Sequence, residues 1–129
     1  MTYNNTTQVQ ISFEDTIARV TEALAAEGFG ILNEIDVQAT MKKKLDVEYD
    51  RYIILGACNP TFAHRALQAE YEIGLMLPCN VIVYEKDDSI FVSAIMPTVA
   101  MGMIDNDELQ SIAEQVETKL TNVINTVKK

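Results

Sequence analysis

The two cysteines of this chain are its main candidates for reactive residues, because of their chemistry and their similar sequence contexts. Each is followed by asparagine and touched by proline, in Cys58-Asn59-Pro60 and in Pro78-Cys79-Asn80. Thiolates are nucleophiles and metal ligands, and an asparagine amide both donates and accepts hydrogen bonds. The only histidine, His64, lies between the two motifs. The pattern predicts a site formed by Cys58, Asn59, His64, Cys79 and Asn80.

The first hypothesis is that a small polar or anionic ligand binds at these residues. A helix is predicted to start directly after Cys58, because asparagine suits the N-cap and proline suits the first helical position. The first turn of a helix offers free amide donors and the positive end of the helix dipole. Such a position favours a thiolate or a bound anion. The sequence therefore favours a small-ligand binding or sensor module.

Other functions stay open. A thiol-dependent enzyme would use Cys58 as its nucleophile and His64 as its base. A soft-metal site would combine the thiols with His64 for zinc, or with Met96, Met101 and Met103 for Cu(I). The cysteine and histidine spacing matches no zinc motif, and methionine also suits flexible apolar packing. A purely structural interaction module is the last alternative, and no cofactor is indicated.

The acidic composition excludes several classes of protein. The 129 residues include 19 acidic and 10 basic side chains, which gives a net charge of −9. Because this field repels phosphates and anionic lipids, we expect neither a nucleic acid nor a membrane as partner. The basic run 42–44 is typical of a solvated helix face. Dinucleotide-binding, nucleoside-triphosphate, serine-hydrolase and zincin motifs are absent from the sequence.

Length and the N-terminal residues predict a single cytoplasmic domain. Residues 1–7 have neither a basic start nor an apolar stretch, which argues against a signal peptide or a membrane span. A chain of 129 residues that is 48% hydrophobic can bury one real core, so we expect one domain over residues 1–129. Two cysteines are not needed as a disulfide framework at this size, and a reducing compartment would keep them free.

Hydrophobic patterns predict the elements that position the candidate residues. Alternating or continuous apolar runs predict strands over 8–13, 30–37, 52–58, 80–85 and 89–96. Helical spacing and capping residues predict helices over 13–27, 39–45 and 60–71, and a long final helix from Asp105, with Glu108 as its capping-box partner. The polar residues 86–88 predict a hairpin turn between the last two strands.

The order strand, helix, strand, helix, strand, helix, strand, strand, helix predicts a single α/β (α+β) domain. We expect a mixed sheet of about five strands with helices packed on it and with its parallel part linked by helices. The run 52–58 is apolar without alternation, which predicts a central strand covered on both faces. If that strand is parallel to a neighbour, Cys58 lies at the carboxyl end of the sheet, where open α/β sheets bind ligands.

Three segments form a combined pattern: Gly56-Ala57-Cys58-Asn59-Pro60, Ala63-His64-Arg65-Ala66-Leu67 and Leu77-Pro78-Cys79-Asn80-Val81-Ile82-Val83-Tyr84-Glu85. The earlier Gly28-Phe29-Gly30 and Glu34-Ile35-Asp36 fit the same pattern. Together they resemble the bacterial and archaeal domain-of-unknown-function 302 family, over nearly the whole chain. The resemblance implies a small α/β domain that is often a homodimer. It implies no established activity, substrate, cofactor or catalytic residue.

Overall fold

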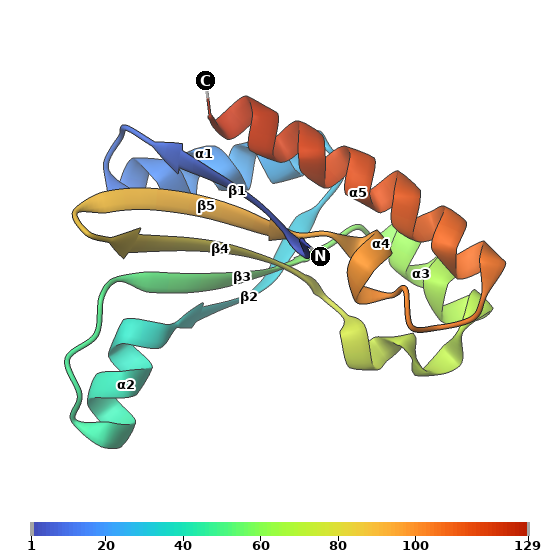
Figure 1. Cartoon of the computed structure of the whole chain (residues 1–129), viewed down its shortest axis with the longest axis horizontal. Helices are drawn as coiled ribbons and strands as arrows, with labels where there is room; N and C mark the ends of the chain where they lie inside the picture. The colour runs from blue at the N-terminus through green and yellow to red at the C-terminus, as the bar shows by residue number, and fades with distance from the viewer. Residues whose placement is uncertain (1, 129) are drawn as a thin grey trace.

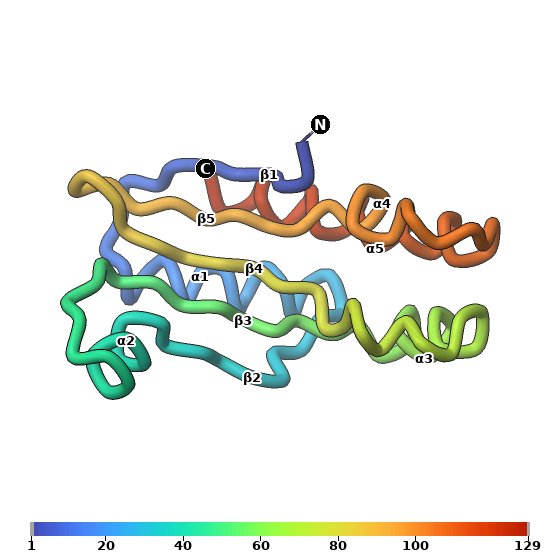
Figure 2. Tube along the Cα trace, turned by 60° about the horizontal axis from the view of Figure 1, so that its bottom comes forward, coloured from blue at the N-terminus to red at the C-terminus, as the bar shows by residue number. Residues whose placement is uncertain are grey.

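The computed structural model describes residues 2–128, and at its centre is a five-stranded sheet in the order β1-β5-β4-β3-β2 (Figure 2). The strands are β1 Asn4–Val9, β2 Gly30–Asp36, β3 Tyr52–Cys58, β4 Cys79–Lys86 and β5 Ser89–Ile95. Every strand pair in this sheet is antiparallel. The predicted α+β domain, its five strands and the order of its main elements are confirmed, whereas the expected parallel part of the sheet is wrong.

The connections between strands explain the antiparallel pairing. Strands β2, β3, β4 and β5 are neighbours both along the chain and in the sheet. Helix α2 (Val37–Leu45) joins β2 to β3, and α3 (Pro60–Ala69) with the 3₁₀ helix η1 (Tyr71–Met76) joins β3 to β4. These helices are therefore insertions between antiparallel neighbours and not crossovers between parallel strands. Helix α1 (Phe13–Ala26) instead carries the chain from β1 at one edge to β2 at the other.

Helices α1 and α5 (Asp107–Val127) lie side by side on one face of the sheet (Figure 1). Helix α5 also contacts α3 and the short helix α4 (Pro97–Ala100). Its buried side chains repeat at helical spacing, as the sequence predicts: Leu109, Ile112, Ala113, Val116, Leu120, Val123, Ile124 and Val127. They meet buried strand residues such as Leu55, Val83 and Val92, which form the other half of the core.

The opposite face of the sheet, called here the open face, is not covered by α1 or α5 (Figure 1). Strand β3 alternates between the two faces, so Leu55 is buried while Tyr52 and Ile54 on the open face are only half-buried. The prediction that this strand is covered on both faces is therefore wrong, and the middle strand is β4. Three aromatic rings, Tyr52, Tyr84 and Phe91, stack across β3, β4 and β5 with centroids 5.5 and 5.3 Å apart.

Local capping signals set the ends of α1. The Ser12 hydroxyl is the N-cap and accepts a hydrogen bond from the Asp15 amide at 3.1 Å. The helix ends at Ala26, shortly before Gly28, whose φ of +87° lies in the left-handed region that glycine adopts easily. The predicted strand over 8–13 is wrong, because β1 ends at Val9 and the apolar Phe13 is already the first helical residue.

The later boundaries are close to those expected. The hairpin turn between β4 and β5 is confirmed, with Asp87 and Asp88 at φ values of 53° and 64°. Two successive residues with positive φ match the right-handed twist of the flanking strands. The final helix starts later than predicted, because Asn106 and not Asp105 is its N-cap and accepts from the Leu109 amide at 3.0 Å.

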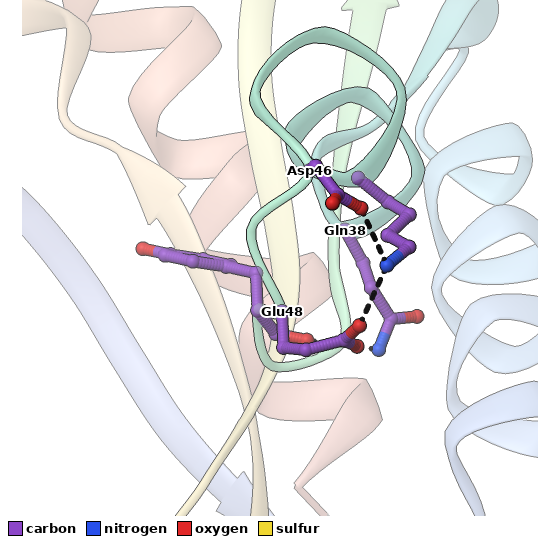
Figure 3. Close-up of polar contacts among 5 residues, drawn as sticks. Gln38, Asp46 and Glu48 are labelled. Atoms are coloured by element: carbon purple, nitrogen blue, oxygen red, sulfur yellow. Dashed lines mark hydrogen bonds and ion pairs between the residues drawn. The ribbon is translucent and has the colours of Figure 1, made fainter.

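Helix α2 extends from one end of the sheet, and none of its residues is buried (Figure 1). Polar contacts hold it to the loop that follows. The Gln38 Nε2 donates to the Tyr49 carbonyl oxygen at 2.9 Å, and the Lys42 Nζ lies 2.7 Å from Asp46 Oδ1 and 2.9 Å from Glu48 Oε1 (Figure 3). The basic run 42–44 is exposed, as expected. Within residues 2–128, no helix has both the length and the apolar character that crossing a membrane requires.

Candidate functional site

The two cysteine motifs meet at the end of the sheet where β3 stops and β4 starts. Ala57 is paired with Cys79 in the register, so Cys58 is one residue beyond a directly opposed pair. Both cysteines are free. They line the same small cavity of about 30 Å³, called here the inner cavity, which lies where the sheet meets α3, α4 and α5. Its other walls include Phe29, Phe62, Ala66, Leu77, Pro97 and Ile112.

Asn59 and Pro60 fix the helix start beside Cys58, and α3 begins at Pro60 as predicted. Asn59 occupies the N-cap position, but its side chain makes no capping hydrogen bond. Its Nδ2 donates instead to the Glu27 carbonyl oxygen at 3.2 Å, which joins the start of α3 to the end of α1. A Cβ atom at Gly28 would lie 3.0 Å from that same Nδ2. The first turn of α3 therefore reaches the inner cavity without a capping side-chain acceptor.

Cys79 is buried, with 8% of its surface exposed. This burial, with a smaller contribution from the nearby Cys58, raises the pKa of the Cys79 thiol to about 11. At neutral pH the group is therefore a protonated thiol, which is a poor nucleophile. Any chemistry that needs a thiolate at Cys79 has to compensate for its buried position.

The structure does not place His64 with the two thiols. His64 is exposed on α3, whereas Phe62, Ala63 and Ala66 of the same helix line the inner cavity. Because these residues lie on the side of the helix that faces the cavity, the imidazole is directed away from Cys58. Among residues 2–128, no group of three or more His, Cys, Asp or Glu side chains is arranged to hold a metal ion. The imidazole is therefore not placed beside the two thiols, either as a base for Cys58 or as a third ligand.

A second hollow, called here the outer groove, lies on the other side of the β4 start and has a volume of about 280 Å³. Asn80 lines this groove; it is exposed and follows the buried Cys79 on the strand. The groove and the inner cavity share a wall formed by Leu77, Pro78, Cys79, Pro97 and Met101. The candidate residues thus fall into two adjacent hollows that share a wall: Cys58, Asn59 and Cys79 line the inner cavity, and Cys79 and Asn80 line the outer groove.

Gly56 has no side chain, and this allows neighbouring residues to pack closely against β3 at this end of the sheet. A Cβ atom there would collide with Asn33 Oδ1 and would lie 2.8 Å from Pro78 Cγ. The absence of a side chain lets the Asn33 amide and the Pro78 ring pack directly over β3. The Gly56-Ala57-Cys58 part of the motif therefore has a packing reason that is separate from the chemistry of the thiol.

Sequence reasoning missed most of the wall residues. Leu77, Pro97 and the α5 residues Ile112, Ala113 and Val116 line the inner cavity, but nothing in their local sequence distinguishes them from ordinary core. The methionine-rich run after β5 was a usable signal. Of its methionines, Met101 lines both hollows and is buried, whereas Met103 is 80% exposed.

The fold and the site define an α+β domain with a five-stranded antiparallel sheet and a thiol-lined cavity at one end of that sheet. The chain belongs to the family described as "Domain of unknown function DUF302", which matches residues 5–127, and the resemblance seen in the sequence is confirmed. The crystal structure of the uncharacterized conserved protein DUF302 from Bacillus stearothermophilus is similar, with 29% identity, a TM-score of 0.92 and 98% of each chain covered. No curated protein matches the sequence.

Proposed function

We propose that the chain binds a small ligand with an apolar body and one polar group, in the outer groove and the inner cavity. The observation that carries this proposal is the shared wall of the two hollows, at the place where the two cysteine motifs meet. Cys58, Asn59, Cys79 and Asn80 surround the ligand, and His64 lies outside the site. The protein would act as a binding or sensor module.

The dimensions of the hollows limit the size of the ligand. Small-molecule sites usually measure roughly 300–1,000 Å³ and are mostly apolar with a few polar groups. The outer groove, at about 280 Å³, lies near the lower end of that range. The Asn80 amide at this groove can both donate and accept a hydrogen bond. The inner cavity, at about 30 Å³, has room for only one small substituent of the ligand.

Indole and 1-butanol are suitable probes, because each has an apolar body and one polar group. In spectra of protein with ¹³C-labelled methionine methyls, we expect either probe to shift the Met101 resonance and to leave that of the exposed Met103 unchanged. Ala100→Phe, which fills the groove, should abolish the shift, whereas the same substitution at the exposed Ala25 on α1 should not. A Met101 resonance that stays unmoved at saturating probe would contradict the proposal.

The proposal includes a cytoplasmic location. Both cysteines are free, and a reducing compartment would keep them available to a ligand.

We also propose that the chain forms a homodimer through the open face of the sheet. Along one cross-strand row of this face, Ile35, Ile54, Ile82, Ser93 and Thr6 are successive partners, and none of them is charged. The chain as a whole carries a net charge of −9. Two copies would repel each other least where they meet through such an uncharged row. A hollow of about 500 Å³ on this face is lined by the row members Thr6, Ile82 and Ser93. Its lining also includes Tyr3, Tyr49, Tyr52 and the charged residues Asp50, Glu85 and Lys86.

Sedimentation equilibrium tests this surface. We expect the wild-type protein to have twice the 14.4 kDa mass of the chain. Ile82→Glu, which places a charge in the row, should give a monomer, whereas Ala25→Glu on the exposed side of α1 should stay dimeric. A dimer that tolerates Ile82→Glu, or a wild-type protein that is monomeric, would contradict the proposed surface.

A further inference from the structure

Three sulfur-bearing residues line the inner cavity. Cys58 ends β3, Cys79 begins β4, and Met101 directly follows α4, so the three come from separate parts of the chain. Met101 is 5% exposed, and Gln110 Nε2 of α5 donates to its carbonyl oxygen at 2.8 Å, which holds its backbone in place. Asn59 is the one other polar residue of the lining, and no carboxylate or imidazole belongs to it. The cavity therefore offers soft donors without hard ones.

We propose that the inner cavity binds one Cu(I) ion through Cys58, Cys79 and Met101. This inference rests on the proposed function, because the ion would occupy the innermost part of the same site. Thiolates and thioethers select Cu(I), whereas divalent ions such as Mg²⁺ and Mn²⁺ need the oxygen ligands that this cavity lacks. A volume of about 30 Å³ is on the order of the space of one water molecule, so the ion enters without a hydration shell.

The net charge of such a centre follows from its ligands. When Cu(I) binds, each cysteine ligand releases one proton to solvent, and the thioether of Met101 adds no charge. Two thiolates and one monovalent cation leave a single negative charge. The first turn of α3 lies beside this charge, and its amides have no side-chain acceptor because the Asn59 amide bonds to Glu27. The positive end of α3 therefore stabilises the centre.

The other methionines provide matched controls. Met103 belongs to the same short run but is 80% exposed, and Met96 does not line the inner cavity. Met101→Leu removes the thioether and nearly preserves the volume, so we expect the core to keep its packing. Met103→Leu makes the same chemical change on the surface. A difference between these two variants therefore reports on the position of the sulfur in the cavity.

The test is an anaerobic titration of the fully reduced protein with Cu(I), in competition with the chromophoric chelator bicinchoninate. We expect one Cu(I) to bind per chain and to protect both Cys58 and Cys79 from alkylation by N-ethylmaleimide, mapped by mass spectrometry. Met101→Leu should weaken the binding at least about tenfold, the scale on which changes around a metal site commonly act. Met103→Leu should bind as the wild type does, and Mn²⁺, which needs oxygen ligands, should give no protection.

Two results would overturn the inference: alkylation that one equivalent of Cu(I) leaves unchanged, or equal Cu(I) affinities for Met101→Leu and Met103→Leu. If Met101→Leu fails to fold, Cys58→Ser at the half-buried strand end replaces it and should abolish the one-to-one complex. Indole titration of the same samples separates this inference from the proposed function. If the protein binds indole but not Cu(I), only the proposed metal site is contradicted. If it binds Cu(I) but not indole, the proposed binding of an apolar ligand is contradicted.

Discussion

Two cysteines with matching local sequences have different surroundings. Cys79 begins β4 on the side of the sheet that faces the core, opposite Ala57, and is buried. Cys58 is the last residue of β3, next to the start of α3, and is only half-buried. The difference follows from position in the sheet, because Cys79 is paired with Ala57, whereas Cys58 lies one residue beyond the last pair of β3 with β4. Matching motifs therefore do not imply matching reactivity.

The raised pKa of Cys79 predicts that stability falls at alkaline pH. The thiol has an ordinary pKa of 9.0 and a pKa of about 11 in the folded protein, so above pH 9 the unfolded chain loses its proton first. The contribution is fully present below pH 9 and is lost as pH rises to about 11. Because one pKa unit is about 1.4 kcal/mol, we expect a loss of about 2 to 3 kcal/mol in the free energy of unfolding. Urea denaturation at several pH values measures it.

Cys79→Ala is the matched variant for this measurement, because other groups that titrate in this range are unchanged by it. We expect the difference in the free energy of unfolding between wild type and Cys79→Ala to shrink as pH rises from 9 to 11. A difference that stays constant over this range would show that Cys79 does not carry the effect.

Gly56 gives a second prediction at the residue scale. Gly56→Ala adds a Cβ that meets Asn33 and the Pro78 ring, so we expect a loss of about 1 to 3 kcal/mol in the free energy of unfolding. Gly30→Ala on the neighbouring β2 is the control, since nothing lies within 4 Å of its added Cβ. Combining Gly56→Ala with Asn33→Ala should recover part of the loss, and full additivity of the two changes would contradict the proposed collision.

Local signals made parts of the candidate site predictable. Ser12 capping α1 and the start of α3 at Pro60 depend on residues within a few positions of each other. The meeting of Cys58 with Cys79, and the separation of His64 from both, depend on strand register and helix rotation. The Asn59 bond to Glu27 joins residues that are 32 positions apart. No local pattern contains that information.

At the scale of elements, the N-cap residue of α5 links this helix to the end of α3. The Asn106 Oδ1 accepts from the Leu109 amide at 3.0 Å, while its Nδ2 donates to the Ala69 carbonyl oxygen at 2.8 Å and so reaches the end of α3. One side chain thus caps the longest helix and joins it to the segment that forms the site. The sequence predicted the helix but assigned its cap to Asp105, because both residues are good caps.

Asn106→Ala removes these two hydrogen bonds and a longer one from Nδ2 to Glu70 Oε1 at 3.4 Å, so we expect the free energy of unfolding to fall by about 1 to 2 kcal/mol, measured by urea denaturation. Asn125→Ala, on the exposed side of the same helix, controls for the change in helix propensity and should have little effect. Equal losses for the two variants would contradict the capping role. In the Asn106→Ala protein we also expect faster hydrogen exchange at the start of α5.

At the scale of the whole molecule, the order of the five strands and of the four longer helices was predictable, whereas the short helices η1 and α4 and the antiparallel directions of the strands were not. The apolar run of β3 suggested a strand covered on both faces, but Tyr52 and Ile54 lie on the open face. Apolar residues on an uncovered face give the same sequence pattern as residues buried by a second layer of helices. Likewise, the pattern of α2 does not show whether the helix crosses the sheet or extends from its end.

The net charge predicts how salt affects the proposed dimer. Each copy carries a charge of −9, so two copies repel each other even when they meet through an uncharged row. Added salt screens this repulsion, because the Debye length falls from about 30 Å at 0.01 M to about 3 Å at 1 M ionic strength. We therefore expect the dissociation constant from sedimentation equilibrium to decrease as sodium chloride is added. A dissociation constant that increases with salt would instead indicate attraction between charged groups.

The segments between neighbouring strands have a consequence for how this protein family can diversify. Strands β3 and β4 pair directly, so the chain from Asn59 to Pro78 leaves the sheet and returns to it at the same end. The segment from Met96 to Asn106 after β5 also contributes Pro97 and Met101 to the walls of the site. Substitutions and length changes in these two segments can therefore alter the walls of the inner cavity, while the hydrogen-bonded register of the strands is preserved.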